Sequence, residues 1–234
     1  FMGKACIFYI IGTYPDFSTT FIDREVRMLR QWGLDIGLLS IRQPVLRDAL
    51  SQEQRGLERD VIYLIPVQWK TFWAAHFYFL LTRPLAYVGT LLYLLTRPRV
   101  KFRDRVMTTL HFAEGVYAAY LLRKRQARHL HAHFVERAAT VALVAGRLLG
   151  IPYSLAVHAG EDIYVHPVLL PEKFGAASFV ISCTQYNLDY LRQQGIAGLD
   201  GKAFCIHHGL DVRAYPPATH SHRPPLILAV GRLV

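Results

Sequence analysis

The chain has 234 residues, of which 52% are hydrophobic, and its formal net charge is +10. This apolar content is enough for the core of one large or two small domains, which excludes an intrinsically disordered chain. From Arg97 to Arg128 there are nine basic and two acidic residues, so this segment alone carries +7 of the net charge. Such a segment indicates an anionic partner, either a phospholipid surface or nucleic acid.

The three cysteines, Cys6, Cys183 and Cys205, lack the close spacing of a thiol-ligated metal site. Each lies in an apolar run of strand length, which predicts buried thiols in a reducing compartment. The N-terminal apolar run reaches Gly12 without a small-residue cleavage site. We therefore expect the first β-strand there rather than a secretory signal.

Short apolar runs of strand length recur along the chain and alternate with segments of helical spacing. The seven runs cover 5–11, 34–41, 61–65, 129–134, 153–158, 179–183 and 204–208. Strands that alternate with helices predict an α/β fold, in which one parallel sheet is covered by helices on both faces.

Three helices have recognisable boundaries. The first begins near Thr20, which together with Asp23 resembles a capping box. The second is expected over 137–149, ahead of a glycine and a proline that stop it. The third begins after Thr184, a favourable N-cap residue, and stops at Gly195.

The segment 71–96 departs from this alternation because it is rich in aromatic residues and carries one formal charge, Arg83. Its length would span a bilayer. However, Arg83 and Pro84 lie at its centre, where an arginine costs about 2.5 to 3.5 kcal/mol on insertion scales. The tripeptide Thr-Arg-Pro occurs at 82–84 and again at 96–98. We therefore expect two short helices, each ended by proline.

The end of the sequence indicates a domain boundary. Residues 214–225 form a proline-rich polar stretch, and an apolar strand follows at 226–234. This pattern predicts a first domain over 1–213, a linker, and the first strand of a second domain. Because a lone strand cannot bury both of its faces, we expect the sequence to be the first part of a longer protein.

Polar residues follow four of the predicted strands, in the stretches 12–20, 131–136, 158–162 and 207–211. The carboxyl ends of parallel strands face one side of the sheet, so we expect these four stretches to converge on one site. The first of them runs into a helix, whose N-terminal N–H groups favour an anionic ligand.

His129, His131 and His133 alternate along one predicted strand and therefore share one face. We considered a metal site here and favoured hydrogen-bonded histidines, because no nearby carboxylate or cysteine completes a ligand set. The sequence thus predicts that this row binds no functional metal.

The stretch after the fifth predicted strand places His158, Glu161 and Asp162 close together. An imidazole and two carboxylates suit general acid–base catalysis or the recognition of hydroxyl groups. Alternatively, the two acidic residues merely favour the N-terminus of a following helix.

The basic run 97–105 follows directly on the apolar segment. It is interpreted either as a solvated helix face or, with the apolar helices beside it, as a surface for anionic lipid. The candidate membrane-binding residues are Trp73, Phe77, Arg97, Arg99, Lys101 and Arg103.

Five motifs, in this order and with these gaps, resemble the amino-terminal half of the family-four retaining glycosyltransferases. They are YPDFSTTFIDRE, HAHFVERAATVALVAGRLLGIPYSLAVHAGEDIY, ISCTQYNLDYL, IHHGLDVRAYPP and ILAVGRLV. The chain is most similar to the branch that builds colanic acid and other bacterial exopolysaccharides, and the resemblance is weakest over 43–128. It implies the GT-B architecture, in which two Rossmann-like domains face each other across a cleft.

The resemblance also implies an activity. Such an enzyme is a hexosyltransferase-type glycosyltransferase, which moves a sugar from a nucleotide-sugar donor to a saccharide or lipid-linked acceptor with retention. If arginine and lysine bind the diphosphate, the chemistry requires no metal, so we expect neither a metal nor a cofactor. The buried thiols and the candidate membrane-binding residues predict a cytoplasmic location at the inner face of the plasma membrane. The donor is held mainly by the second domain, so we expect this chain alone to be inactive.

Several residues match positions of the family motifs. His158 and Asp162 match catalytic positions of the cleft, and Arg232 matches the arginine that contacts the donor diphosphate. The double glycine that many relatives carry after the first strand is absent here. The residues that correspond to the acceptor side and the lining of the cleft are Gly12, Ser18, Thr20, His133 and Glu161.

An alternative hypothesis is a non-catalytic basic module that binds the surface of an anionic membrane. A nucleic-acid-binding module would interleave aromatic residues with lysine and arginine. In this chain the aromatic residues gather in the uncharged stretch 72–93 instead. We therefore expect no nucleic-acid partner.

Overall fold

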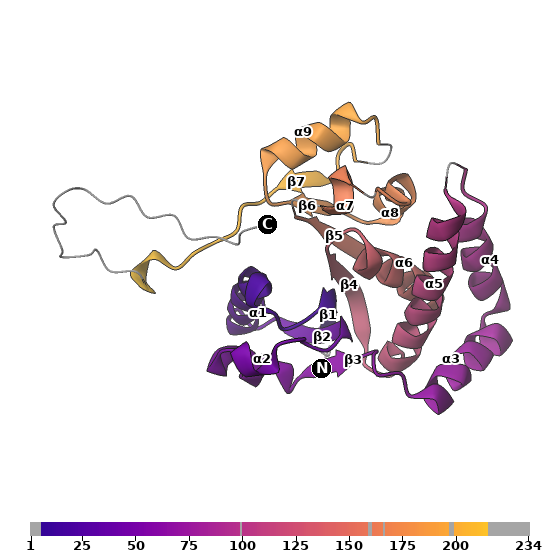
Figure 1. Cartoon of the computed structure of the whole chain (residues 1–234), viewed down its shortest axis with the longest axis horizontal. Helices are drawn as coiled ribbons and strands as arrows, with labels where there is room; N and C mark the ends of the chain where they lie inside the picture. The colour runs from indigo at the N-terminus through magenta and orange to yellow at the C-terminus, as the bar shows by residue number, and fades with distance from the viewer. Residues whose placement is uncertain (1–5, 99, 159–160, 166, 197–198, 215–234) are drawn as a thin grey trace, which may run out of the picture.

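The computed structural model describes residues 6–98, 100–158, 161–165, 167–196 and 199–214 (Figure 1). Within them, seven parallel strands form one sheet in the order β3-β2-β1-β4-β5-β6-β7. All seven predicted strands are present, and the predicted parallel α/β sheet is confirmed. The strands are β1 (Cys6–Thr13), β2 (Asp35–Arg42), β3 (Val61–Tyr63), β4 (Ala127–His133), β5 (Tyr153–Val157), β6 (Val180–Ser182) and β7 (Ala203–Cys205).

The strand order reverses between β1 and β4. The chain first adds β2 and β3 on one side of β1, then returns to place β4 on the other side and continues outward to β7. In register, Tyr9 of β1 lies opposite His131 of β4. The connections that leave the carboxyl ends of β1 and β4 therefore diverge, which is where open α/β sheets bind ligands.

Helices cover both faces of the sheet (Figure 1). α1 (Thr20–Gln31) and α2 (Gln52–Glu58) lie on one face, while the opposite face carries α3 (Trp69–Thr82), α4 (Pro84–Leu95), α5 (Phe102–Leu122) and α6 (Arg137–Leu149). The remaining helices are α7 (Glu161–Tyr164), α8 (Leu170–Ala176) and α9 (Gln185–Gln193), and short 3-10 turns span Phe17–Thr19, Arg47–Ala49 and Val212–Ala214.

Alternate side chains of β1 show why both faces must be covered. Phe8 and Ile10 are buried in the larger core under α5 and α6, whereas Tyr9 and Ile11 are buried in a second core with α1. Successive side chains of a strand point to opposite faces, so a strand of continuous apolar residues fits only between two layers.

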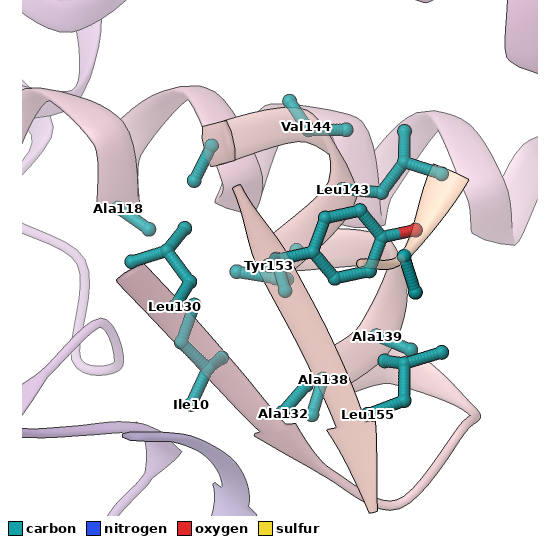
Figure 2. Packing of buried hydrophobic residues seen from close by; sticks show 14 of the residues in the cluster. Ile10, Ala118, Leu130, Ala132, Ala138, Ala139, Leu143, Val144, Tyr153 and Leu155 are labelled. Atoms are coloured by element: carbon teal, nitrogen blue, oxygen red, sulfur yellow. The ribbon is translucent and has the colours of Figure 1, made fainter. Parts of the chain in front are cut away.

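α6 lies at the centre of the larger core, where its alanines pack on β4 and β5 (Figure 2). Its bounds are those predicted from the sequence, and Gly150 ends it in the left-handed conformation at φ 71°. α5 packs closely alongside. A Cβ added to Gly115 of α5 would lie 2.5 Å from Cβ of Val144, so only glycine allows this approach of the two helices.

The segment 71–96 forms two helices, as predicted. α3 ends at Thr82, and Pro84 is the first residue of α4. Arg83 anchors the bend, because its Nη1 donates to the carbonyl oxygen of Leu148 in α6 at 2.9 Å. Among the described residues no single helix is both long and apolar enough to cross a bilayer, although α3 and α4 together meet those criteria across a 108° bend.

The capping residues predicted for the first helix are wrong, although the helix begins at Thr20 as expected. Asp16 and Thr19 form the capping box, one turn ahead of α1. Asp23 is instead buried, and its Oδ2 accepts a hydrogen bond from Nε2 of Gln54 at 2.9 Å. By contrast, Thr184 caps α9 as expected, since its side chain accepts from a backbone N–H of the first turn.

Two further expectations are only partly met. Cys6 is buried as predicted, but Cys183 and Cys205 are half-buried. The linker expected at 214–225 and the strand expected at 226–234 lie outside the described residues, except that Ala214 closes a 3-10 turn.

Candidate functional site

Segments that follow four different strands meet around the aromatic ring of Phe21, in the first turn of α1. Its centroid lies 4.4 Å from that of His208, after β7, and 4.6 Å from that of His158, after β5. The ring of His133, at the end of β4, lies 6.3 Å away. The convergence that parallel topology led us to expect is therefore present, and Phe21 lies at its centre.

A pair of buried imidazoles lies next to Phe21 in this cluster. Nδ1 of His133 and Nε2 of His158 are linked by a hydrogen bond of 3.2 Å, and the two rings stack with centroids 5.4 Å apart. One ring must donate and the other accept, which requires a neutral acceptor. The opposite nitrogens, Nε2 of His133 and Nδ1 of His158, are buried and have no hydrogen-bond partner among the described residues.

Burial keeps this pair uncharged. Desolvation, followed by the nearby His208, lowers the pKa of His158 to about 4. Desolvation also lowers the pKa of His133 well below its usual value, with smaller contributions from the neighbouring imidazoles. Both rings are therefore neutral at pH 7, a form in which each offers one N–H donor and one lone pair.

The other histidines of β4 are also hydrogen-bonded, as expected. Nε2 of His129 and Nδ1 of His131 both lie 2.7 Å from Oγ of Ser154 on β5. Tyr9 packs against the ring of His131 at a centroid distance of 5.0 Å. The row thus forms part of a polar layer between β4, β5 and α1.

A tyrosine–glutamate pair completes this layer, and sequence reasoning missed it. The hydroxyl of Tyr9 donates to Oε1 of Glu25 at 2.5 Å, and burial raises the pKa of Glu25. Glu25 lies four residues after Phe21, so both side chains point from the same face of α1 toward the sheet. This four-residue spacing of Phe21 and Glu25 is the feature of the sequence that could have pointed to Glu25. Ligand atoms of Glu25, His131 and His133 lie within 4.8 Å of one another.

The predicted residues of the first loop lie near the surface. Gly12 is half-buried near the end of β1, and no atom lies within 4 Å of the position that a Cβ would occupy. Ser18 is exposed, and its hydroxyl donates to Oδ1 of Asp16 at 2.7 Å. Thr20 is the exposed first residue of α1. Ser18 therefore takes part in the capping turn, while Gly12 borders open space.

The remaining predicted site residues are described only in part. Glu161 and Asp162 form the start of α7, but their side chains lie outside the described part of the structure. Arg232 lies outside it altogether. His208 was not singled out from the sequence, although it lies in a stretch expected at the site.

The candidate membrane-binding residues separate into two groups. Trp73 and Phe77 are 56% and 62% exposed on α3, and Lys101 and Arg103 are exposed at the start of α5. Arg97 differs from the others in its surroundings. It is half-buried, with its guanidinium 4.1 Å from the ring centroid of Tyr93 and its Nε donating to the carbonyl oxygen of Tyr93 at 2.8 Å.

The basic run is therefore not a continuous solvated helix face. Arg105 donates to the backbone carbonyls of Leu95, Arg97 and Val100, so it covers the end of α4 and the turn after it. The last carbonyls of a helix lack partners within the helix, and an arginine satisfies them favourably. Arg99, the remaining candidate of this run, lies outside the described residues.

No protein-family model and no curated protein matches the chain. Solved structures that resemble the chain include a glycosyltransferase and a sugar-nucleotide epimerase. One is a glycosyltransferase from Rickettsia africae ESF-5, with a TM-score of 0.53 and 10% identity over 94% of this chain and 47% of that chain. The other is a UDP-N-acetylglucosamine 2-epimerase, with a TM-score of 0.51 and 12% identity over 86% of this chain and 48% of that chain. The chain thus spans about half the length of each, and it has the Rossmann-like α/β fold, as predicted.

Proposed function

We propose that the chain is the acceptor-side domain of a retaining glycosyltransferase. The enzyme would move a sugar from a nucleotide-sugar donor to a saccharide or lipid-linked acceptor, in the synthesis of exopolysaccharide or another cell-surface glycan. The fold that it shares with a glycosyltransferase and a sugar epimerase supports this class. The observation that carries the proposal is the neutral pair of His133 and His158 at the carboxyl ends of the strands.

A neutral imidazole pair suits the uncharged hydroxyl groups of a sugar, because each ring offers one N–H donor and one lone pair. The hydrogen bond to His133 fixes the ring of His158, so that its Nδ1 can pair with a sugar hydroxyl. Phe21 packs beside it and excludes water from one side. In this proposal the leaving diphosphate is neutralised by Arg232 and by helix N–H groups, and Asp162 holds a hydroxyl of the substrate.

The test is sugar transfer by the protein extended to its full natural coding sequence. A panel of nucleotide sugars serves as donors, and NMR of the product gives the anomeric configuration. His158→Ala should lower kcat/KM by about 100-fold, the usual range for an imidazole that acts in the transition state. The matched control is His129→Ala, at the opposite end of β4, which should stay near the wild-type rate.

The 234-residue chain should not transfer sugar on its own. A closed cleft supplies on the order of 7 to 11 kcal/mol of the barrier through positioning, and one side of a cleft supplies little of it. Transfer by this chain at the rate of the full protein would contradict the proposed division into acceptor and donor domains. A His158→Ala enzyme with unchanged kinetics would remove this residue from the site.

We also propose that α3 and α4 hold the protein at the cytoplasmic face of an anionic membrane. Ala75 and Phe79 of α3 are buried against the core, while Trp73, Phe77 and Leu81 on the outer face are exposed. A helix that is apolar on all sides needs an apolar environment on both faces. Exposed lysine and arginine at the start of α5 supply the attraction to anionic lipid.

Sedimentation with vesicles tests this attachment. Binding should rise with the fraction of anionic lipid and weaken with salt, and Trp73→Ala with Phe77→Ala should abolish most of it. Trp32→Ala is the matched control, because Trp32 is 74% exposed at the end of α1 on the other face. Equal binding to neutral vesicles at every salt concentration would refute the electrostatic part. Membrane binding by a full-length protein without transferase activity would favour the non-catalytic module.

A further inference from the structure

Side chains from three strand ends converge beside the imidazole pair. His158 follows β5, Cys183 follows β6 and His208 follows β7. One ligand atom from each lies within 4.8 Å of the other two. We propose that His158, Cys183 and His208 form a zinc-binding site. This set differs from the row on β4, and it departs from the metal-free protein that the sequence led us to expect.

The buried ring of His158 presents an atom suited to a metal. Its Nε2 is already linked to Nδ1 of His133, which leaves Nδ1 as the available nitrogen. That atom is buried without a hydrogen-bond partner among the described residues, and the residue as a whole is only 7% exposed. With a metal on Nδ1 of His158, its Nε2 carries the hydrogen and donates a hydrogen bond to Nδ1 of His133. Metal-bound histidines are typically oriented by such a hydrogen bond from their second nitrogen.

The loop that carries His208 is fixed against the neighbouring strand. The amide of Ile206 donates to the carbonyl oxygen of Ser182 at 2.9 Å, and Nδ1 of His207 lies 2.8 Å from the carbonyl oxygen of Cys183. As a result the ring of His208 stacks over that of His158, with centroids 5.2 Å apart and planes 14° apart. The approximate positions of the ligands are therefore set before any ion binds.

The three ligand atoms must move slightly closer together to bind zinc. Zn–N bonds of about 2.0 to 2.1 Å and Zn–S bonds of about 2.3 Å place tetrahedral ligand atoms roughly 3.3 to 3.6 Å apart. The three atoms here lie within 4.8 Å of one another, so movement of about 1 Å closes the site. The exposed ring of His208 can supply that movement, since it lies at the surface.

The ligand types select the ion. One thiolate with two imidazoles favours zinc over magnesium or calcium, which prefer oxygen ligands. Three protein ligands leave a fourth position for water or for an oxygen of a bound molecule, as in open zinc sites. A zinc ion on Nδ1 of His158 would take the atom that the proposed function pairs with a sugar hydroxyl, so in the zinc-bound protein that hydroxyl would bind at the fourth position instead. The test measures metal binding alone and does not depend on sugar transfer.

Cobalt(II) added to the purified, metal-free 234-residue chain is the probe, because its spectrum reports the ligands. We expect equimolar binding, a tetrahedral ligand-field spectrum and a thiolate-to-cobalt charge-transfer band, all displaced by zinc. Cys183→Ser should remove the charge-transfer band. His208→Ala should weaken zinc binding by more than about 100-fold, beyond the loss caused by removing an orienting partner.

Cys205→Ser is the matched control, because Cys205 is equally half-buried at the end of the adjacent strand but is absent from this ligand group. It should keep both the band and the affinity. His208 is exposed, so its substitution should leave the fold intact, which circular dichroism verifies. The proposal is overturned if cobalt does not bind, if it binds without a thiolate band, or if the band survives in Cys183→Ser.

Discussion

Acidification should destabilise this protein through its buried histidines. Burial, followed by the neighbouring imidazoles, lowers the pKa of His131 to about 3, and burial with His208 lowers that of His158 to about 4. An unfolded histidine titrates near 6.5, so the unfolded chain binds more protons as the pH falls from about 6.5 toward 4. The contribution of these histidines to stability is therefore fully present above pH 6.5 and is lost progressively below it.

The size of the effect follows from the two pKa values. For His158, a folded value of about 4 and an unfolded value of about 6.5 remove about 2 kcal/mol of the free energy of unfolding between pH 7 and pH 5. This is a large share of the 5 to 15 kcal/mol that stabilises a typical domain. Burial raises the pKa values of Asp23 and Glu25, and these groups act in the opposite direction.

Because of those opposing groups, the decisive measurement is a difference between variants. Urea unfolding of the metal-free protein at pH 7 and pH 5 should show a fall in stability that is smaller by about 2 kcal/mol in His158→Gln than in the wild type. Thr184→Ala, which removes the N-cap of α9, provides a control that loses about 1 kcal/mol equally at both pH values. A native His158 that titrates near 6.5 by NMR, or an identical pH dependence in His158→Gln, would refute the reasoning.

Two further predictions concern packing and thiol reactivity. Gly115→Ala should lower the free energy of unfolding by about 1 to 3 kcal/mol, because the new methyl group overlaps Val144. In a Val144→Ala background this cost should be smaller. A Gly115→Ala protein that is as stable as the wild type in urea would contradict the close packing of the two helices. Burial, followed by Asp35, raises the pKa of Cys6 to about 11, so its thiolate fraction at pH 8 should be about 100-fold below that of an ordinary cysteine. Thiol-reagent kinetics on metal-free protein should show one slow phase, absent in Cys6→Ser, and equal rates for all cysteines would contradict this.

Part of the candidate site could be predicted from the sequence. The stretches that hold His133 and His158 were expected to meet because polar residues that follow parallel strands gather at one edge of the sheet, and the family resemblance singled out these two residues within them. The roles of Phe21 and Glu25 could not be assigned in the same way. Their meaning depends on which strand faces α1, and the sequence does not contain the strand order.

The sequence by itself determined the local structure of this chain. Apolar runs of strand length, the break at Arg83 and Pro84, and the stop at Gly150 depend on residues that are close together in the chain, where backbone geometry and periodicity decide the outcome. Each of these was predicted within a few residues. The confirmed helix 137–149 shows how completely local signals can define one element.

The tertiary structure alone decided which distant residues meet. It placed Cys183 and His208 beside His158. It also brought Arg97 and Arg105 into hydrogen bonds with carbonyl oxygens of α4. Cys183, His208 and His158 are far apart in the chain, and the sequence around each of them does not predict its partners. These contacts form because the sheet order and the packing of helices on its two faces fix the partners, and those depend on burying the whole core at once.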